Sequence, residues 1–515
     1  ILILILTNAF KLTNFTLPPK EVINNLIKLF NQKQLKSVID HAHALTAEYP
    51  KAFMVWNILG AANKSLGKNI EASQAFKKVT ELNPTYSEGY NNLAITLRDQ
   101  GKLDEALKLS KKALLLNPKS AIFYTNLGLI YQDQNKFDKA IESYNKAVAI
   151  NSNYAEAYYN MGNTLQYQDK LAEAIESFKK ALAIKIDYAE AYLNMGVAFT
   201  KQSKHAEAID AYKKALSLNP NYAEAYYNMG ITHNSSERLV EAVASYTQAI
   251  KINPNYADAF NNLGNTLREQ GKIDEAIDSY IRALSVRSNY PEAYMNMGVT
   301  LIDRGKLAEA IETFKKALAI KNDYLEAYLN MGVAFAKQNK HAEAVDTYKK
   351  ALSIKPDYEI ARARQLHHSA HNCDWEAIEE ISKLIPKLGI VKQSISPFSL
   401  LAFEDAPERH RIRSEIYSTD INPENIIPFQ NLSQKTKKRI RIGYFSADFK
   451  EHPVAYLIAG VLEQHNRNKF KVFGYSLMSH SRSELRQRLV ASFDCFVDIS
   501  GMSDKDKAFR AREDK

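Results

Sequence analysis

A period of 34 residues runs through most of this 515-residue chain. One position of the period is Gly in eight units and Ala in one, and the position twelve residues later is always Ala. Four residues after that Ala, eight of nine units have Phe or Tyr, and Ser110 is the exception. Strict repetition of small residues and rings predicts a stack of similar units, each touching its neighbours. The two small-residue series are Gly60, Ala94, Gly128, Gly162, Gly196, Gly230, Gly264, Gly298, Gly332 and Ala72, Ala106, Ala140, Ala174, Ala208, Ala242, Ala276, Ala310, Ala344.

Each unit carries two apolar stripes with helical spacing, separated by a polar turn such as 270–272. Small residues on the facing sides let two helices approach closely, so each unit predicts a helical hairpin. Pro closes the unit in five repeats: Pro84, Pro118, Pro220, Pro254 and Pro356. The pattern resembles the tetratricopeptide repeat, nine copies of which would fill residues 53–358. The resemblance implies a right-handed superhelix with a long concave surface.

The segment before the nine repeats follows the same phase less closely. Leu26, Ala42, Leu45 and Pro50 occupy repeat positions. Residues 19–52 therefore predict a degenerate repeat that caps the array, and residues 1–18 are left unassigned.

Asparagine recurs two residues before the small residue in eight consecutive units. Each Asn inside a helix is less favourable than Ala by roughly 0.5 kcal/mol. A primary amide both donates and accepts hydrogen bonds, so a ladder of amides can hold the backbone of an extended polypeptide whatever its side chains. The alternative is that recent duplication copied the residue without a function. The candidate peptide-binding residues are Asn92, Asn126, Asn160, Asn194, Asn228, Asn262, Asn296 and Asn330.

Charge and composition restrict the partners. The net charge is +10, but residues 435–515 alone contain 17 Lys and Arg against 10 Asp and Glu, and the repeats offer no basic stripe. This distribution argues against a nucleic-acid partner. The longest apolar runs, 1–6 and 454–462, are shorter than the roughly 20 residues of a membrane-spanning helix, so no membrane partner is expected. Two cysteines favour a reducing compartment, and we expect the cytoplasm.

Residues 359–434 predict a helical connector. Its first part places His367, His368, His371 and Cys373 close together in sequence, and these residue types suit a metal ion. Their spacing matches no zinc pattern, so the favoured interpretation is a helix that packs Cys373 and Trp375 as apolar groups, with no metal. Prolines then predict an irregular segment: Pro397, Pro407, Pro423 and Pro428.

Residues 435–515 change to alternating strands and helices. Strands are predicted at 439–446, 470–477 and 493–499, with helices at 454–465 and 483–491. This order is typical of the start of a doubly wound parallel sheet, whose ligands bind beyond the carboxyl ends of the strands. The turn from Ser446 to Pro453 lies at such an end. The predicted fold class is therefore mostly α, followed by the incomplete start of an α/β lobe.

A family resemblance rests on this C-terminal region together with the repeats. The segments Cys373-Asp-Trp375, Arg441-Ile-Gly-Tyr-Phe-Ser-Ala-Asp-Phe449, His452-Pro453 and Lys469-Phe-Lys-Val-Phe-Gly-Tyr475 resemble the bacterial form of the O-linked N-acetylglucosamine transferase family. The resemblance implies a Rossmann-like, GT-B type lobe. It implies transfer of a sugar, most simply from UDP-GlcNAc, to Ser or Thr of proteins, with the Asn ladder guiding the acceptor polypeptide.

The same resemblance makes His452 the candidate catalytic residue, because the family's His-Pro histidine lines the acceptor site and is a candidate general base. An imidazole that titrates near neutral pH can accept a hydroxyl proton. The alternative is that His452 caps or positions the following helix. No cofactor is expected besides the nucleotide-sugar donor.

The family also has a second lobe, which holds the nucleotide diphosphate. This chain ends at Lys515, so we expect a fragment truncated within the first lobe and inactive by itself. The alternative function is a non-catalytic tetratricopeptide scaffold for protein–protein interaction.

Overall fold

The computed structural model describes residues 17–391, 393–396, 400, 403–421, 439–478, 483–502, 507 and 510–511. The apolar run 1–6 and the basic residues 435–438 lie outside this part of the chain. The chain divides into two compact units, Ile1–Tyr417 and Ser418–Lys515. The division falls inside one helix rather than at residue 435, and each unit is described by itself.

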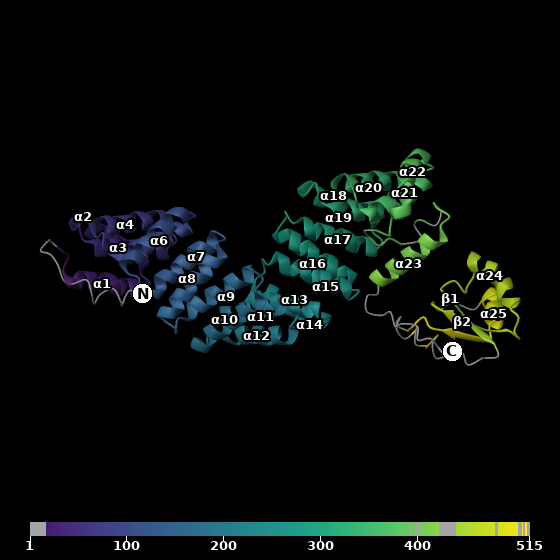
Figure 1. Cartoon of the computed structure of the whole chain (residues 1–515), viewed down its shortest axis with the longest axis horizontal. Coiled ribbons are helices and arrows are strands. Elements are labelled where there is room, and N and C mark those ends of the chain that lie inside the picture. Colours follow the sequence, from purple (N-terminus) through teal and green to yellow (C-terminus); the bar gives the residue numbers. More distant parts are fainter. Residues whose placement is uncertain are drawn as a thin grey trace. The chain divides into compact units, whose positions relative to one another are not determined.

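The first unit is a succession of helical hairpins (Figure 1). In each repeat, an odd-numbered first helix of 13 residues is followed by an even-numbered second helix of 14 residues. Two helices precede the first regular hairpin. The helices are α1 (Lys20–Asn31), α2 (Leu35–Glu48), α3 (Phe53–Ser65), α4 (Asn69–Leu82), α5 (Ser87–Asp99), α6 (Leu103–Leu116), α7 (Ala121–Asp133), α8 (Phe137–Ile150), α9 (Ala155–Tyr167), α10 (Leu171–Ile184), α11 (Ala189–Lys201), α12 (His205–Leu218), α13 (Ala223–Ser235), α14 (Leu239–Ile252), α15 (Ala257–Glu269), α16 (Ile273–Val286), α17 (Pro291–Asp303), α18 (Leu307–Ile320), α19 (Leu325–Lys337) and α20 (His341–Ile354).

Each hairpin is locked by one aromatic ring of the second helix against one glycine of the first. A Cβ atom on Gly162 would lie 2.6 Å from Cε1 of Phe178, closer than carbon atoms can approach. The same overlap occurs at every Gly of the series, each with the ring 16 residues later. The one unit with Ala94 in place of Gly is also the unit with Ser110 in place of the ring. The two exceptions therefore compensate each other.

The turn inside each hairpin depends on one residue in the left-handed conformation. Gly271 has φ of 76°, its N–H bonds to the carbonyl of Arg268, and the N–H of Lys272 reaches back to Leu267. These bonds cap the carbonyls left open at the end of the first helix. Other repeats place a side chain in this strained region, for example Glu237 with φ of 59°.

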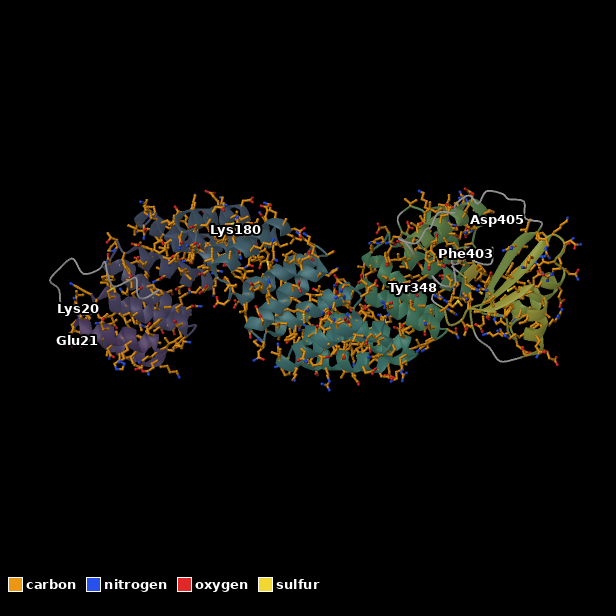
Figure 2. All side chains as sticks on the ribbon, turned by 90° about the horizontal axis from the view of Figure 1, so that it is seen from below. Lys20, Glu21, Lys180, Tyr348, Phe403 and Asp405 are labelled. Carbon is orange, nitrogen blue, oxygen red and sulfur yellow. The ribbon has the colours of Figure 1, made fainter. Side chains whose placement is uncertain are left out.

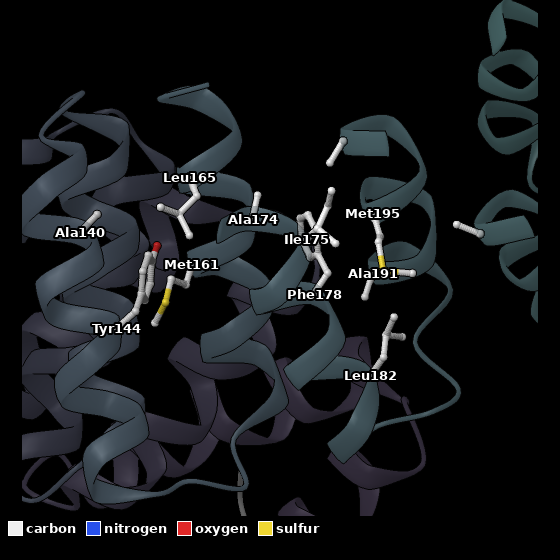
Figure 3. Packing of buried hydrophobic residues seen from close by; sticks show 12 residues of the cluster. Ala140, Tyr144, Met161, Leu165, Ala174, Ile175, Phe178, Leu182, Ala191 and Met195 are labelled. Carbon is white, nitrogen blue, oxygen red and sulfur yellow. The ribbon is translucent and has the colours of Figure 1, made fainter. Parts of the chain in front are cut away.

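The apolar cores are divided along the array. Tyr144, Met161, Phe178 and Met195 form one cluster that crosses three successive hairpins (Figure 3). On the outside, the side chains that project from the helices end mostly in nitrogen and oxygen atoms (Figure 2). Among the described residues, no helix is long and apolar enough to cross a bilayer.

The connector corrects two predictions. It contains α21 (Glu359–His371), α22 (Trp375–Ser382) and a 3₁₀ turn (Ile385–Lys387). Cys373 and Trp375 were expected to pack as apolar groups, but Cys373 is exposed and Trp375 is 68% exposed. This prediction is wrong because α22 buries its opposite face at Ile381.

The segment after residue 397 is also not wholly irregular. Helix α23 (Pro407–Ile421) begins at a proline, whose missing N–H costs nothing in the first turn. From this helix the fully buried Arg413 donates to the carbonyls of Leu388 and Ile385, at 2.8 and 2.7 Å, and pairs with Glu404. A buried guanidinium whose donors are satisfied thus anchors α23 to the connector.

The second unit contains a three-stranded parallel sheet in the order β1-β2-β3. The strands are β1 (Ile440–Ser446), β2 (Phe470–Ser476) and β3 (Cys495–Asp498), with α24 (Pro453–Glu463) and α25 (Glu484–Ala491) between them (Figure 1). Phe449, Ala459, Val472, Leu489 and Phe493 belong to the cluster that packs both helices against the sheet. This is the strand and helix order expected from the sequence, within one or two residues at each boundary.

Candidate functional site

The asparagine ladder lies on the first helices of the repeats, from Asn92 on α5 to Asn330 on α19. First helices of consecutive repeats contact one another directly, as α5 does α7 and α17 does α19. Seven of the eight side chains are half-buried, and Asn160 is buried. The ladder is therefore a row of partly accessible amides on adjacent helices.

Most ladder amides are held in place by the preceding repeat. The Nδ2 atom donates to the side chain 35 residues earlier, which comes immediately before the previous ladder residue. Asn126 donates to Oδ1 of Asn91 at 2.9 Å, and Asn262 donates to the Tyr227 hydroxyl at 3.1 Å. The same arrangement joins Asn92 to Asn57, Asn194 to Tyr159, Asn296 to Asn261 and, through sulfur at 4.0 Å, Asn330 to Met295.

These bonds orient each amide and leave its oxygen available. Asn194 uses both N–H groups, the second on Asn163 at 2.8 Å. Within the described residues, Oδ1 of Asn194 and Oδ1 of Asn296 accept no hydrogen bond from the protein. The oriented amides therefore present chiefly acceptors, which a backbone N–H of a bound polypeptide can fill.

Carboxylates run beside the ladder, and the sequence analysis missed them. They recur four residues before the ladder Asn, hence one helical turn away on the same face. Asp258 is paired with Arg287 at 2.9 Å, so it is not available to a partner in the same way as the exposed Glu190 and Glu224. Their 34-residue recurrence was the available signal. The row is Glu88, Glu156, Glu190, Glu224, Asp258, Glu292 and Glu326, with Ile122 as the exception.

In the second unit, polar residues meet at the carboxyl edge of the sheet. The register pairs Ser446 with Ser476, and Ser476 with Asp498, so the last residues of all three strands are aligned. The turn to α24 leaves from this edge, and the N–H of Asp448 donates to Oγ of Ser446 at 2.9 Å. Polar groups are thus collected where parallel sheets bind ligands.

His452 is the residue before the first turn of α24. Its Nδ1 accepts a hydrogen bond from the N–H of Val454 at 3.2 Å and lies 3.8 Å from Oδ2 of Asp448. The ring is 38% exposed. A neutral ring that accepts at Nδ1 carries its proton on Nε2, so in this arrangement Nε2 is a donor. To accept a proton at Nε2, the ring must exchange Val454 for Asp448 as the partner of Nδ1.

The connector histidines are closer together than their spacing suggested. His367, His368 and His371 can each place one ring nitrogen within 4.8 Å of the others. His341, at the start of α20, joins them with Nδ1 3.0 Å from Nδ1 of His368. Burial, followed by the neighbouring imidazoles, lowers the pKa of His368 to about 4 and also lowers the pKa of His367. Sequence reasoning missed His341 because it lies in the last repeat, outside the connector.

The comparisons with known proteins follow this division of the chain. Residues 419–514 match the family described as Glycosyl transferase family 41. Models described as TPR repeat or tetratricopeptide repeat match overlapping segments that together run from residue 55 to 357. The crystal structure of YrrB, "a TPR protein with an unusual peptide-binding site", aligns with 28% identity and a TM-score of 0.32 over 36% of this chain and 96% of that one.

Curated relatives match over short segments. The probable UDP-N-acetylglucosamine–peptide N-acetylglucosaminyltransferase SEC of Arabidopsis thaliana is 41% identical over 78 residues, 15% of this chain and 8% of that protein. The UDP-N-acetylglucosamine–peptide N-acetylglucosaminyltransferase of Caenorhabditis elegans is 32% identical over 83 residues, 16% of this chain and 7% of that protein. The matches therefore span less than a tenth of these relatives. The chain joins an array of tetratricopeptide repeats to a segment of glycosyl transferase family 41, and it resembles the O-GlcNAc transferases in this combination.

Proposed function

We propose that the chain is part of a protein O-glycosyltransferase that moves a sugar, most simply N-acetylglucosamine from UDP-GlcNAc, to Ser or Thr of proteins held by its repeats. The observation that carries the proposal is the family 41 segment in the same chain as an ordered row of amides. The names of the two curated relatives, both peptide N-acetylglucosaminyltransferases, support this donor and this acceptor class.

The repeats supply the acceptor site in this proposal. Oriented Oδ1 atoms at 34-residue intervals accept from backbone N–H groups, which every polypeptide has, so the ladder holds extended segments with little sequence preference. The neighbouring carboxylates, of which Glu190 and Glu224 are exposed, favour segments that carry Lys or Arg.

A binding experiment tests the ladder. Asn194, Asn228, Asn262, Asn296 and Asn330 are replaced together by Ala, and affinity for a panel of unfolded acceptor peptides is measured by fluorescence anisotropy. We expect weaker binding with unchanged or slightly higher helicity, because Ala is the better helix former. The matched control replaces five asparagines that follow the second helices: Asn83, Asn117, Asn151, Asn219 and Asn253. Equal affinity of the ladder variant and the control would mean that the ladder is a relic of duplication.

His452 is the proposed general base for the acceptor hydroxyl, with Asp448 as the group that takes over Nδ1–H when Nε2 accepts the proton. Because the same ring caps α24 through Val454, removal of His452 alone does not separate the two roles. His452→Asn does separate them, since an Asn oxygen caps a helix as well but cannot act as a base.

Sugar transfer from radiolabelled UDP-GlcNAc to acceptor peptides is the decisive assay, carried out on the gene product that contains this chain. We expect His452→Ala and His452→Asn both to lower turnover by about 100-fold or more, the usual loss for an acid–base group. If His452→Asn retains activity while His452→Ala loses it, the histidine is a cap. Peptide binding without any transfer would support the alternative function, a non-catalytic scaffold, whose repeats need no second unit to hold a peptide.

A further inference from the structure

Four imidazole rings from two adjacent helices pack against one another at the end of the repeat array. His341 begins α20, and His367, His368 and His371 occupy the last turns of α21. Ring centroids are 4.6 Å apart for His341 and His371, 4.6 Å for His367 and His371, and 5.2 Å for His341 and His368. Imidazoles gathered this closely need a shared partner or a network of hydrogen bonds, because each ring carries two polar nitrogens.

The nitrogen positions suit one central ion. His367, His368 and His371 can each direct one nitrogen to within 4.8 Å of the other two. Nδ1 of His341 and Nδ1 of His368 are 3.0 Å apart. Two nitrogens on a tetrahedral zinc ion, each about 2.05 Å from the metal, are separated by about 3.3 Å. A small rotation of each ring therefore converts the direct contact into shared coordination.

The surroundings hold the rings in place. Nδ1 of His371 donates to the carbonyl oxygen of His367 at 2.9 Å, which leaves Nε2 of His371 with its lone pair free for a metal. The ring of Tyr348 stacks on His368 with centroids 5.9 Å apart. His341, His367 and His368 are half-buried and His371 is exposed, so the cluster is partly dry and has an open side for an ion to enter.

The repeats contain a built-in comparison. His205 occupies, four repeats earlier, the position of His341 at the start of a second helix. The helix that follows it, α13, carries His233 alone, where α21 carries three histidines. His205 is therefore a matched control for the effect of losing one such histidine without losing the cluster.

We propose that His341, His367, His368 and His371 form a binding site for one divalent transition-metal ion, with Zn²⁺ as the expected occupant. Neutral imidazole is a preferred ligand of Zn²⁺, Ni²⁺ and Cu²⁺, whereas Mg²⁺ and Ca²⁺ prefer oxygen. The ion joins the last repeat to the first helix of the connector. Because it binds only the folded arrangement, it stabilises this end of the array.

The test is calorimetric titration of the chelator-treated 515-residue chain with ZnCl₂ at neutral pH, and with MgCl₂ for comparison. We expect one Zn²⁺ per chain, no Mg²⁺, and a rise in the melting temperature with Zn²⁺. The double variant His367→Ala/His371→Ala is expected to lower the Zn²⁺ affinity at least about 100-fold, and His341→Ala about 10-fold or more. His205→Ala is expected to leave it unchanged.

Circular dichroism of every variant checks that helicity is retained, and the conservative double variant His367→Gln/His371→Gln repeats the test should the Ala variant unfold. The proposal is overturned if the wild-type chain takes up no Zn²⁺, or if the double variants bind it as tightly as the wild type. Loss of affinity in His205→Ala equal to that in His341→Ala would also overturn it, because binding would then not depend on the cluster.

Discussion

The contact between Gly162 and Phe178 predicts a mutational effect that reverses its sign with the partner. A Cβ atom at position 162 would meet three ring atoms at 2.6, 2.8 and 2.9 Å, whereas ordinary contacts begin near 3.4 Å. The ring must therefore move, and overpacking of this kind costs about 1–3 kcal/mol. Ala recovers only about 1 kcal/mol as the better helix former. We expect Gly162→Ala to lower the free energy of unfolding by about 2 kcal/mol.

Removal of the ring should turn this loss into a gain. Phe178→Ser alone is expected to cost about 3–5 kcal/mol by opening a cavity. In that background the new methyl group meets no ring, so Gly162→Ala should add about 1 kcal/mol. The coupling energy in the double-mutant cycle is then about 3 kcal/mol. The repeat with Ala94 and Ser110 already has this combination.

Urea denaturation followed by circular dichroism measures the four free energies, and hydrogen exchange in α9 and α10 locates the change, because a repeat array can unfold in parts. As a control, Ala94→Gly should cost about 1 kcal/mol, since no ring faces that position. An equal loss from Gly162→Ala with and without the Phe178 ring would refute the explanation.

Three further outcomes are expected. Glu237→Gly should raise the free energy of unfolding by up to about 1 kcal/mol in urea denaturation, because Glu237 is held at φ of 59°; no gain would mean that the turn is not strained. Burial raises the pKa of Tyr212 and of Tyr280 to about 12, so stability should be constant below pH 10, the pKa of an unfolded tyrosine, and fall as pH rises towards 12; melting temperatures unchanged up to pH 12 would contradict this. Asp494→Ala should cost about 1–3 kcal/mol in denaturation and speed exchange of the Val472 amide, which donates to Asp494 at 2.6 Å; unchanged exchange would contradict the bond.

Features set by local periodicity could be predicted from the sequence. The helical hairpins follow from small residues and rings that recur every 34 residues, and the three strands follow from apolar runs of seven or eight residues. Trp375 was mispredicted because its size suggests burial, while the face that α22 turns inward is set by contacts far from it in sequence. Pro407 was read as a break, although a proline fits the first turn of a helix.

The candidate sites depended on contacts between neighbouring elements. The amide partners lie 35 residues before the ladder, and in five of eight cases they are Asn or Tyr: Asn57, Asn91, Tyr159, Tyr227 and Asn261. This recurrence could have been noticed, but only the structure gives the direction of each bond. His341 joins the other histidines because α20 packs on α21, which no spacing within the connector indicates.

The spacing of 35 residues between bonded partners bears on how such a chain evolves. A salt bridge joins Arg98 to Asp133 and another joins Arg268 to Asp303 over this separation, as the amide bonds do. Recombination that removes or adds one whole 34-residue unit therefore brings an equivalent donor opposite an equivalent acceptor. The number of repeats can change by unequal crossing-over without new compensating mutations at the junction. Selection can thus adjust the length of the array in single, fully bonded steps.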